Sequence, residues 1–224
     1  MAIRDWPAEE RPREKFIRKG AASLSDAELL ALIIRTGSRG ASAVDIARDL
    51  IARYGGVRAM LAAPFDELCR TPGLGASKCV QLHAARELGV RYLAEELTRG
   101  GALESPRQAL DYLTMILRDL PVEAFGCLFL DTRHQVLAYE TLFEGTVNSA
   151  SVHPREVVRR VLHHNAAAVI IAHNHPSGVA EPSNADISIT RRLKDALALV
   201  DVRLLDHLVI GNGESVSLAE RGEV

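Results

Sequence analysis

The spacing of the apolar residues changes near residue 100, and this change limits the fold more than any other feature of the sequence. Between Ser23 and Glu96 they recur at helical spacing, as in LSDAELLALIIRTG and SAVDIARDLIARYG, each of which ends at a glycine. Ser25 followed by Glu28 is the pattern of a capping box at the start of the first helix. This half therefore predicts a compact all-helical domain of about five short helices.

Strands and helices alternate in the second half. SPRQALDYLTMILRDL predicts a helix, AFGCLFLDTRHQVLAYETLFEGTV predicts a hairpin that turns at residues 131–135, and HPREVVRRVLHHN predicts a helix with Pro154 first. The strand AAAVIIA, a helix from about Asn184 to Leu199 and two strands within VRLLDHLVIGNGESVSL follow. The chain is therefore predicted to be α+β, with a helical domain over residues 1–100, a linker within residues 98–106, and an α/β domain over residues 101–224.

Composition excludes several classes of protein. Apolar residues make up 47% of the chain and charged residues 25%, which is typical of a globular protein. Only 4% of the residues are aromatic, so few side chains are available on which the bases of a single-stranded nucleic acid could stack. Cys69, Cys79 and Cys127 form no C-x-x-C pair, which argues against a disulfide framework or a cysteine zinc site and favours the cytoplasm. The charged N-terminus and short apolar runs predict neither export nor a membrane span.

Two histidines follow the buried-looking strand in AAAVIIAHNHPSG. Side chains alternate along an extended chain, so His173 and His175 are expected to project to one side and converge on an ion, while Asn174 points away. Asp186 follows after a loop long enough to fold back and supply a third ligand, which would leave a fourth position for water. The alternative is structural, because Ser183 and Asp186 also fit the N-cap and N3 positions of the next helix.

The stretch HNHPSGVAEPSNAD resembles the metal-binding signature of the JAMM/MPN metalloproteases. GTVNSASVHPREV upstream and LLDHLVIG downstream resemble the RadC proteins in particular, and this resemblance covers the whole chain. It implies a layered domain similar to that of cytidine deaminases, and one Zn²⁺ per chain held by His173, His175 and Asp186. It also implies hydrolysis of an amide bond in a protein or peptide substrate.

The same resemblance implies two further functional residues. Ser183 matches the serine that helps to hold the oxyanion, and Glu123 in VEAFGCLFL matches the glutamate that acts as general base just before a glycine-containing strand. A solvated connector remains the alternative for Glu123, and Glu156 is a competitor that its helix N3 position already explains. Asn174 departs from the Ser or Thr usual in JAMM deubiquitinases, so isopeptidase activity is not implied.

Residues 67–89, ELCRTPGLGASKCVQLHAARELG, resemble a helix-hairpin-helix motif. Its glycines would expose backbone N–H groups to a DNA phosphate, and a plain interhelical turn is the alternative. Residues 1–100 carry 16 basic and 13 acidic side chains, and this small excess of positive charge is compatible with a contact to DNA. The leading hypothesis is a zinc metalloprotease. Its rivals are a DNA-repair accessory protein that binds DNA through the helical domain, and a metal-dependent nuclease.

Overall fold

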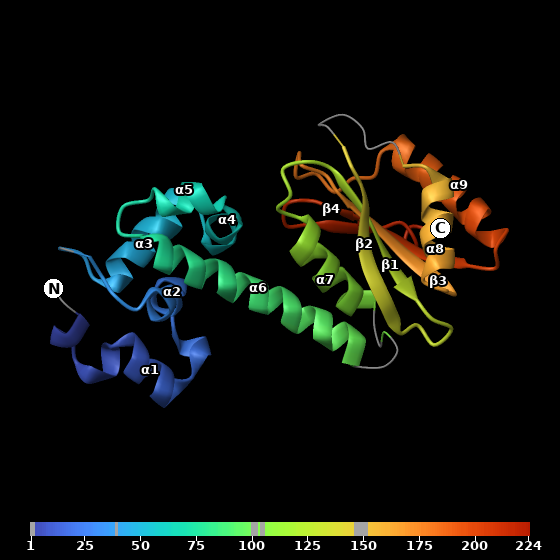
Figure 1. Ribbon diagram of the computed structural model, residues 1–224. Helices are drawn as coiled ribbons and strands as arrows, with labels where there is room; N and C mark the ends of the chain where they lie inside the picture. Colours follow the sequence, from blue (N-terminus) through green and yellow to red (C-terminus); the bar gives the residue numbers. More distant parts are fainter. Residues whose placement is uncertain (1–2, 39, 100–102, 104–105, 146–151) are drawn as a thin grey trace. The chain divides into compact units, whose positions relative to one another are not determined.

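The computed structural model describes residues 3–38, 40–99, 103, 106–145 and 152–224, drawn as the coloured ribbon in Figure 1. The chain divides into two units, Met1–Gly89 and Val90–Val224, and helix α6 (Ala76–Arg99) runs from the first into the second. The linker predicted within residues 98–106 falls largely outside the described residues, as does most of the GTVNSAS stretch. No helix in the described ranges is long and apolar enough to span a bilayer.

The first unit is helical. Besides α6 it contains three short 3-10 turns and five α-helices: α1 (Pro12–Lys19), α2 (Asp26–Ile34), α3 (Ala43–Tyr54), α4 (Val57–Ala62) and α5 (Phe65–Cys69). Its core is formed by apolar side chains of α2, α3 and the later helices, among them Leu30, Ile34, Val44, Leu50, Met60, Leu68 and Leu82. The sequence did not predict α1, which begins with a proline at its first turn and is tied to α2 by an ion pair between Lys15 and Glu28.

Capping residues set the helix boundaries in this unit. Both reciprocal hydrogen bonds of the predicted capping box between Ser25 and Glu28 are present, and Gly55 ends α3 in the left-handed conformation, as expected. The prediction that Gly37 ends α2 was wrong, because α2 ends at Ile34. Gly37 instead permits a close backbone approach, since a Cβ there would lie 2.1 Å from the Ala41 carbonyl oxygen.

The second unit confirms the α+β prediction. Its helices are α7 (Pro106–Leu117), α8 (Pro154–His163) and α9 (Asn184–Ala198), and its strands are β1 (Ala124–Leu130), β2 (Val136–Glu144), β3 (Ala168–Asn174), β4 (Arg203–Ile210) and β5 (Ser215–Ser217). They form one mixed sheet in the order β2-β1-β3-β4-β5, in which only β3 and β4 pair in parallel. The predicted hairpin is β1–β2, and β3 is the central strand.

Helices cover both faces of this sheet, with α7 on one side and α8 and α9 on the other (Figure 1). Val169 and Ile171 of β3 belong to the core beneath α8 and α9, whereas Ala168, Ile170 and Ala172 belong to the core beneath α7. A strand buried on both faces needs a continuous apolar run, which explains the sequence AVIIA. By the same alternation, His173 points towards α9 and Asn174 towards the α7 side.

Candidate metal centre

His173 and His175 lie where the central strand ends. His173 is within β3 and 1% exposed, and His175 follows one residue after the strand. The structure brings the two imidazoles together as the alternation predicted, with 2.9 Å between their Nε2 atoms. The carboxyl end of β3 therefore presents two nitrogen atoms at one point.

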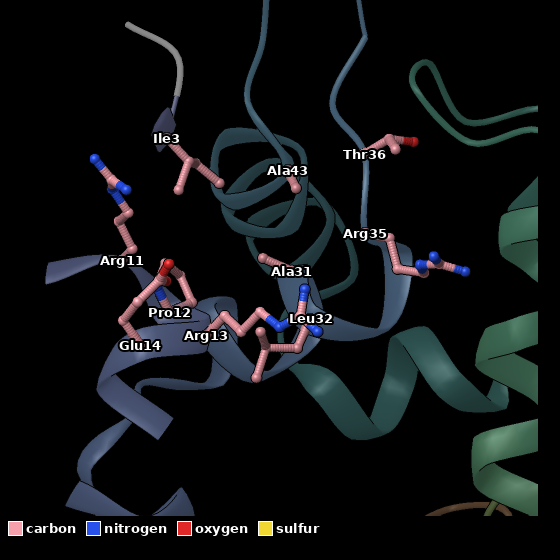
Figure 2. A pocket seen from close by; sticks show the side chains of 10 residues that line it. All are labelled: Ile3, Arg11, Pro12, Arg13, Glu14, Ala31, Leu32, Arg35, Thr36 and Ala43. Atoms are coloured by element: carbon pink, nitrogen blue, oxygen red, sulfur yellow. The ribbon is translucent and has the colours of Figure 1, made fainter. Parts of the chain in front are cut away.

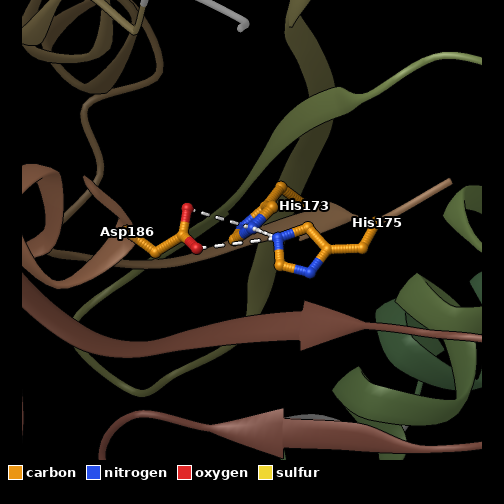
Figure 3. Close-up of side chains that lie close together, drawn as sticks. All are labelled: His173, His175 and Asp186. Carbon is orange, nitrogen blue, oxygen red and sulfur yellow. Dashed lines mark hydrogen bonds and ion pairs between the residues drawn. The ribbon is translucent and has the colours of Figure 1, made fainter. Parts of the chain in front are cut away.

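Asp186 reaches these nitrogens from the start of α9. It is the N3 residue of a complete capping box in which Oδ2 accepts hydrogen bonds from the Ser183 backbone N–H and hydroxyl, both at 2.7 Å. Its Oδ1 lies 3.2 Å from His173 Nε2, and its Oδ2 lies 3.6 Å from His175 Nε2 (Figure 3). The capping role and the predicted position at the metal site are thus compatible, because Oδ2 accepts the capping hydrogen bonds while Oδ1 stays free of them and faces His173.

The three side chains fit a divalent metal ion. One ligand atom from each lies within 4.8 Å of the others, and no other such group of three occurs among the described residues. Zinc bonds of about 2.0–2.1 Å in tetrahedral geometry put neighbouring ligand atoms about 3.3 Å apart. The observed separations of 2.9–3.6 Å bracket that value.

A chain of hydrogen bonds fixes the tautomer of His173. The Thr190 hydroxyl donates to the Asp186 carbonyl oxygen, so it accepts the bond from Nδ1 of the buried His207. His207 Nε2 must then accept from His173 Nδ1–H, at 2.8 Å. The lone pair of His173 is therefore on Nε2, the atom that faces Asp186.

His175 is oriented in the same sense. Its Nδ1 lies 2.7 Å from the Val179 carbonyl oxygen, which accepts only, so Nδ1 carries the proton and Nε2 the lone pair. Two lone pairs 2.9 Å apart and a carboxylate oxygen repel one another unless a cation or a proton lies between them. A metal ion requires ligand atoms of this kind, which carry a lone pair and no proton.

The same side chains also shift one another's pKa values. Burial by itself would raise the pKa of Asp186, but hydrogen bonds from His173, His175 and Ser183 outweigh it and hold this pKa well below its usual range. Burial lowers the pKa of His207, and a proton on the neighbouring His173 would lower it further. Asp186 is therefore ionised and His207 neutral at physiological pH. The hydrogen bond to Asp186 raises the pKa of His175, so protons compete with a metal for this nitrogen as the pH falls.

The connector that holds Glu123 is fixed by Asn174. This fully buried amide accepts from the Ala124 N–H at 2.8 Å and donates to the carbonyl oxygens of Leu120 and Val122. Glu123 is half-buried between these anchored residues, and its charge helps to raise the pKa of His175. The role of Glu123 as a base stays a prediction.

The other proposed residues are also located. The Ser183 hydroxyl donates to Asp186 and so must turn away from it before it can donate to an oxyanion. Glu156 forms an ion pair with Arg159 on α8 and does not belong to the three-ligand group.

Sequence reasoning missed Thr190 and Gly211. Thr190 follows Asp186 by four residues, so helical spacing puts both on one face of α9. A Cβ on Gly211 would lie 2.5 Å from the Gly178 carbonyl oxygen and 2.8 Å from the Ala180 nitrogen. Only a glycine at position 211 lets the loop that carries the Val179 carbonyl pack this closely against the end of β4.

The mixed sheet, its helices and the two histidines with an aspartate define a JAB-type domain. In agreement, the RadC-like JAB domain family matches residues 103–223, and the UPF0758 N-terminal family matches residues 3–80. The chain belongs to this RadC, or UPF0758, family, which confirms the resemblance seen in the sequence. UPF0758 proteins of Stutzerimonas stutzeri, Halorhodospira halophila and Nitrosococcus oceani are 61%, 60% and 59% identical to it, each over 99% of both chains.

Replacing Asn174 tests its part in anchoring the Glu123 connector. Asn174→Ala leaves one buried N–H and two carbonyl groups without their partner, so the free energy of unfolding should fall by about 2–4 kcal/mol. The capacity to bind a metal ion should remain, because Asn174 and His173 point to opposite faces of the sheet. Urea denaturation and metal analysis measure both, with the exposed Asn184→Ala as control. Unchanged stability would contradict the anchoring role.

Adding a single methyl group at Gly211 should weaken metal binding. In Gly211→Ala the Cβ displaces residues 178–180 and with them the carbonyl group that orients His175, so zinc affinity should drop about 10–100-fold while the sheet persists. Competition with a chromophoric chelator measures the affinity, and circular dichroism checks the fold. Gly75→Ala is the control, since a Cβ there meets no atom within 4 Å. Equal affinity in both variants would refute the close packing.

Proposed function

We propose that this chain is a zinc-dependent hydrolase that cleaves an amide bond in a protein or peptide. The observation that carries the proposal is the convergence of the His173 and His175 Nε2 lone pairs with an oxygen of Asp186. Two histidines and one carboxylate are the protein ligands of several hydrolytic zinc sites, which keep a further position open. Zinc fits this nitrogen and oxygen set at the observed separations.

Each side chain then has a definite task. A zinc ion held by these three residues would act as a Lewis acid and would make the attacking water easier to deprotonate. The Glu123 carboxylate accepts a proton from the attacking water and delivers it to the leaving amine nitrogen. Ser183 turns its hydroxyl from Asp186 towards the oxygen of the attacked carbonyl group. His207 and Thr190 keep His173 in the tautomer that binds the metal.

A nuclease is the weaker alternative. Two-metal nucleases hold their ions about 3.5–4 Å apart and need a second set of ligands. The described part of the chain contains one group of three ligand atoms and no second one. The geometry therefore favours hydrolysis of an amide bond over hydrolysis of a phosphodiester.

Measurements of zinc content and of peptide hydrolysis test the metal centre and the catalytic base separately. The full chain should carry about one zinc ion, which His173→Ala removes. Glu123→Gln should keep its zinc but hydrolyse a peptide library about 10²–10⁴-fold more slowly, and Glu156→Gln should match the wild type in both measurements. Chains without zinc would exclude the metal centre, and a fully active Glu123→Gln variant would exclude this base.

A DNA contact by residues 67–89 is a second candidate function. Helices α5 and α6 flank a turn at residues 71–75 in which Gly73 has φ of +88°. This is the arrangement of a helix-hairpin-helix, in which N–H groups at the start of the second helix face a phosphate. The Lys78 ammonium group donates to the Gly73 carbonyl oxygen at 2.9 Å, so it stabilises the turn and does not reach outwards.

Binding of duplex DNA at several salt concentrations tests this contact. The affinity should fall steeply as salt increases, because each phosphate contact releases counterions. Gly75→Ala should weaken binding without loss of stability, since its methyl group enters the open space in front of α6. Fluorescence anisotropy gives both results. No binding at low salt, or equal binding by the variant, would leave residues 71–75 as an interhelical turn.

A further inference from the structure

The first unit contains a pocket of about 620 Å³ that neither the zinc site nor the DNA contact uses. It lies where α1 meets α2, and Figure 2 shows Arg11 on one side and Arg35 on the other, with Arg13 between them. Its wall is apolar at Ile3, Pro12 and Leu32. A pocket of this size holds a small organic molecule.

Positive charge dominates this pocket. Three arginines and a single acidic residue, Glu14, are among the lining residues, and the Arg11 and Arg35 side chains extend outwards from the two sides of the pocket (Figure 2). Arg11 is held by a hydrogen bond from its Nε to the Trp6 carbonyl oxygen. Arg13 and Arg35 are exposed, and within the described ranges neither side chain has a hydrogen bond or an ion pair. Guanidinium forks bind phosphate groups with paired hydrogen bonds, so they favour a phosphorylated ligand.

The backbone at Arg35 is strained. Its φ of +62° and ψ of −42°, with a 2.6 Å hydrogen bond from the Thr36 N–H to the Ile34 carbonyl oxygen, form a γ-turn that is costly for any residue except glycine. The helix end itself does not require an arginine. An arginine at this position is explained if its side chain serves the pocket.

Nearby acidic residues restrict the size of the ligand. Glu9 and Glu10 are exposed on the short turn η2 (Ala8–Glu10) just before Arg11, and they line a second hollow together with Lys19 and the ion pair between Lys15 and Glu28. The Glu9 and Glu10 carboxylates repel a polyanion that continues from the pocket past Arg11. The Glu14 carboxylate can accept hydrogen bonds from the hydroxyl groups of a sugar.

We propose that the pocket between α1 and α2 binds a small phosphate ester of a hydroxylated compound, such as a mononucleotide, with Arg13 and Arg35 holding the phosphoryl group. The apolar wall then receives the rest of the ligand. This site is separate from the proposed hydrolase activity, because every residue that lines it belongs to the first unit.

Calorimetric titration of the full chain with adenosine monophosphate, inorganic phosphate and adenosine tests the proposal. The monophosphate should bind saturably with Kd of about 1 mM or tighter, phosphate more weakly, and adenosine not at all. Arg13→Gln and Arg35→Gly should each weaken binding about tenfold, whereas Arg53→Gln, another exposed arginine, should leave it unchanged. The fluorescence of Trp6, the single tryptophan, provides a second readout.

Arg35→Gly also separates binding from folding. Glycine relieves the γ-turn, so the unfolding temperature should equal or exceed that of the wild type while the affinity falls. The proposal is overturned if neither phosphate compound binds, if adenosine binds equally well, or if both arginine variants keep full affinity. A single-stranded oligonucleotide that needs Arg13 and Arg35 for tighter binding than the monophosphate would also overturn it, in favour of nucleic acid.

Discussion

The hydrogen-bonded chain from the Asp186 carbonyl through Thr190 and His207 to His173 is the constraint on which the metal site depends. It joins α9, β4 and the central strand β3, and it has one consistent arrangement of protons, which leaves the lone pair of His173 on Nε2. Within this chain of hydrogen bonds the Thr190 hydroxyl and both ring nitrogens of His207 have partners, so these buried polar groups stabilise the core and do not weaken it. The parallel pairing of β3 with β4 provides the register, since Ile171 lies opposite His207.

One strand organises both halves of the proposed chemistry. Successive residues of β3 point to opposite faces, so His173 meets Asp186 on the α9 side while Asn174 ties down the connector after α7 that carries Glu123. Any shift in the register of β3 would move the metal ligand and the proposed base together. Gly211 adds a second support, because its missing side chain lets the loop with the Val179 carbonyl close over His175.

Local pattern predicted most of the second unit and the convergence of the three ligands. The apolar run of β3, the proline at the start of α8 and the Ser183–Asp186 spacing each reflect a local rule that the fold retains. The residues that local pattern could not predict form hydrogen bonds to residues far away in the sequence. Thr190 meets His207 across 17 residues, and Asn174 meets Leu120 across 54. The end of α2 was misplaced for a similar reason, because Gly37 serves a close contact with Ala41 and not the helix terminus.

X-ray absorption at the zinc edge of the purified full chain tests the central claim most directly. A single zinc site with two imidazole nitrogens and carboxylate or water oxygens at about 2.0–2.2 Å is expected, and His175→Ala should lose one of the two imidazole contributions or the zinc itself. A spectrum with sulfur neighbours at about 2.3 Å would place the metal on the cysteines. That result, or an imidazole signal unchanged in His175→Ala, would contradict the assignment of His173, His175 and Asp186.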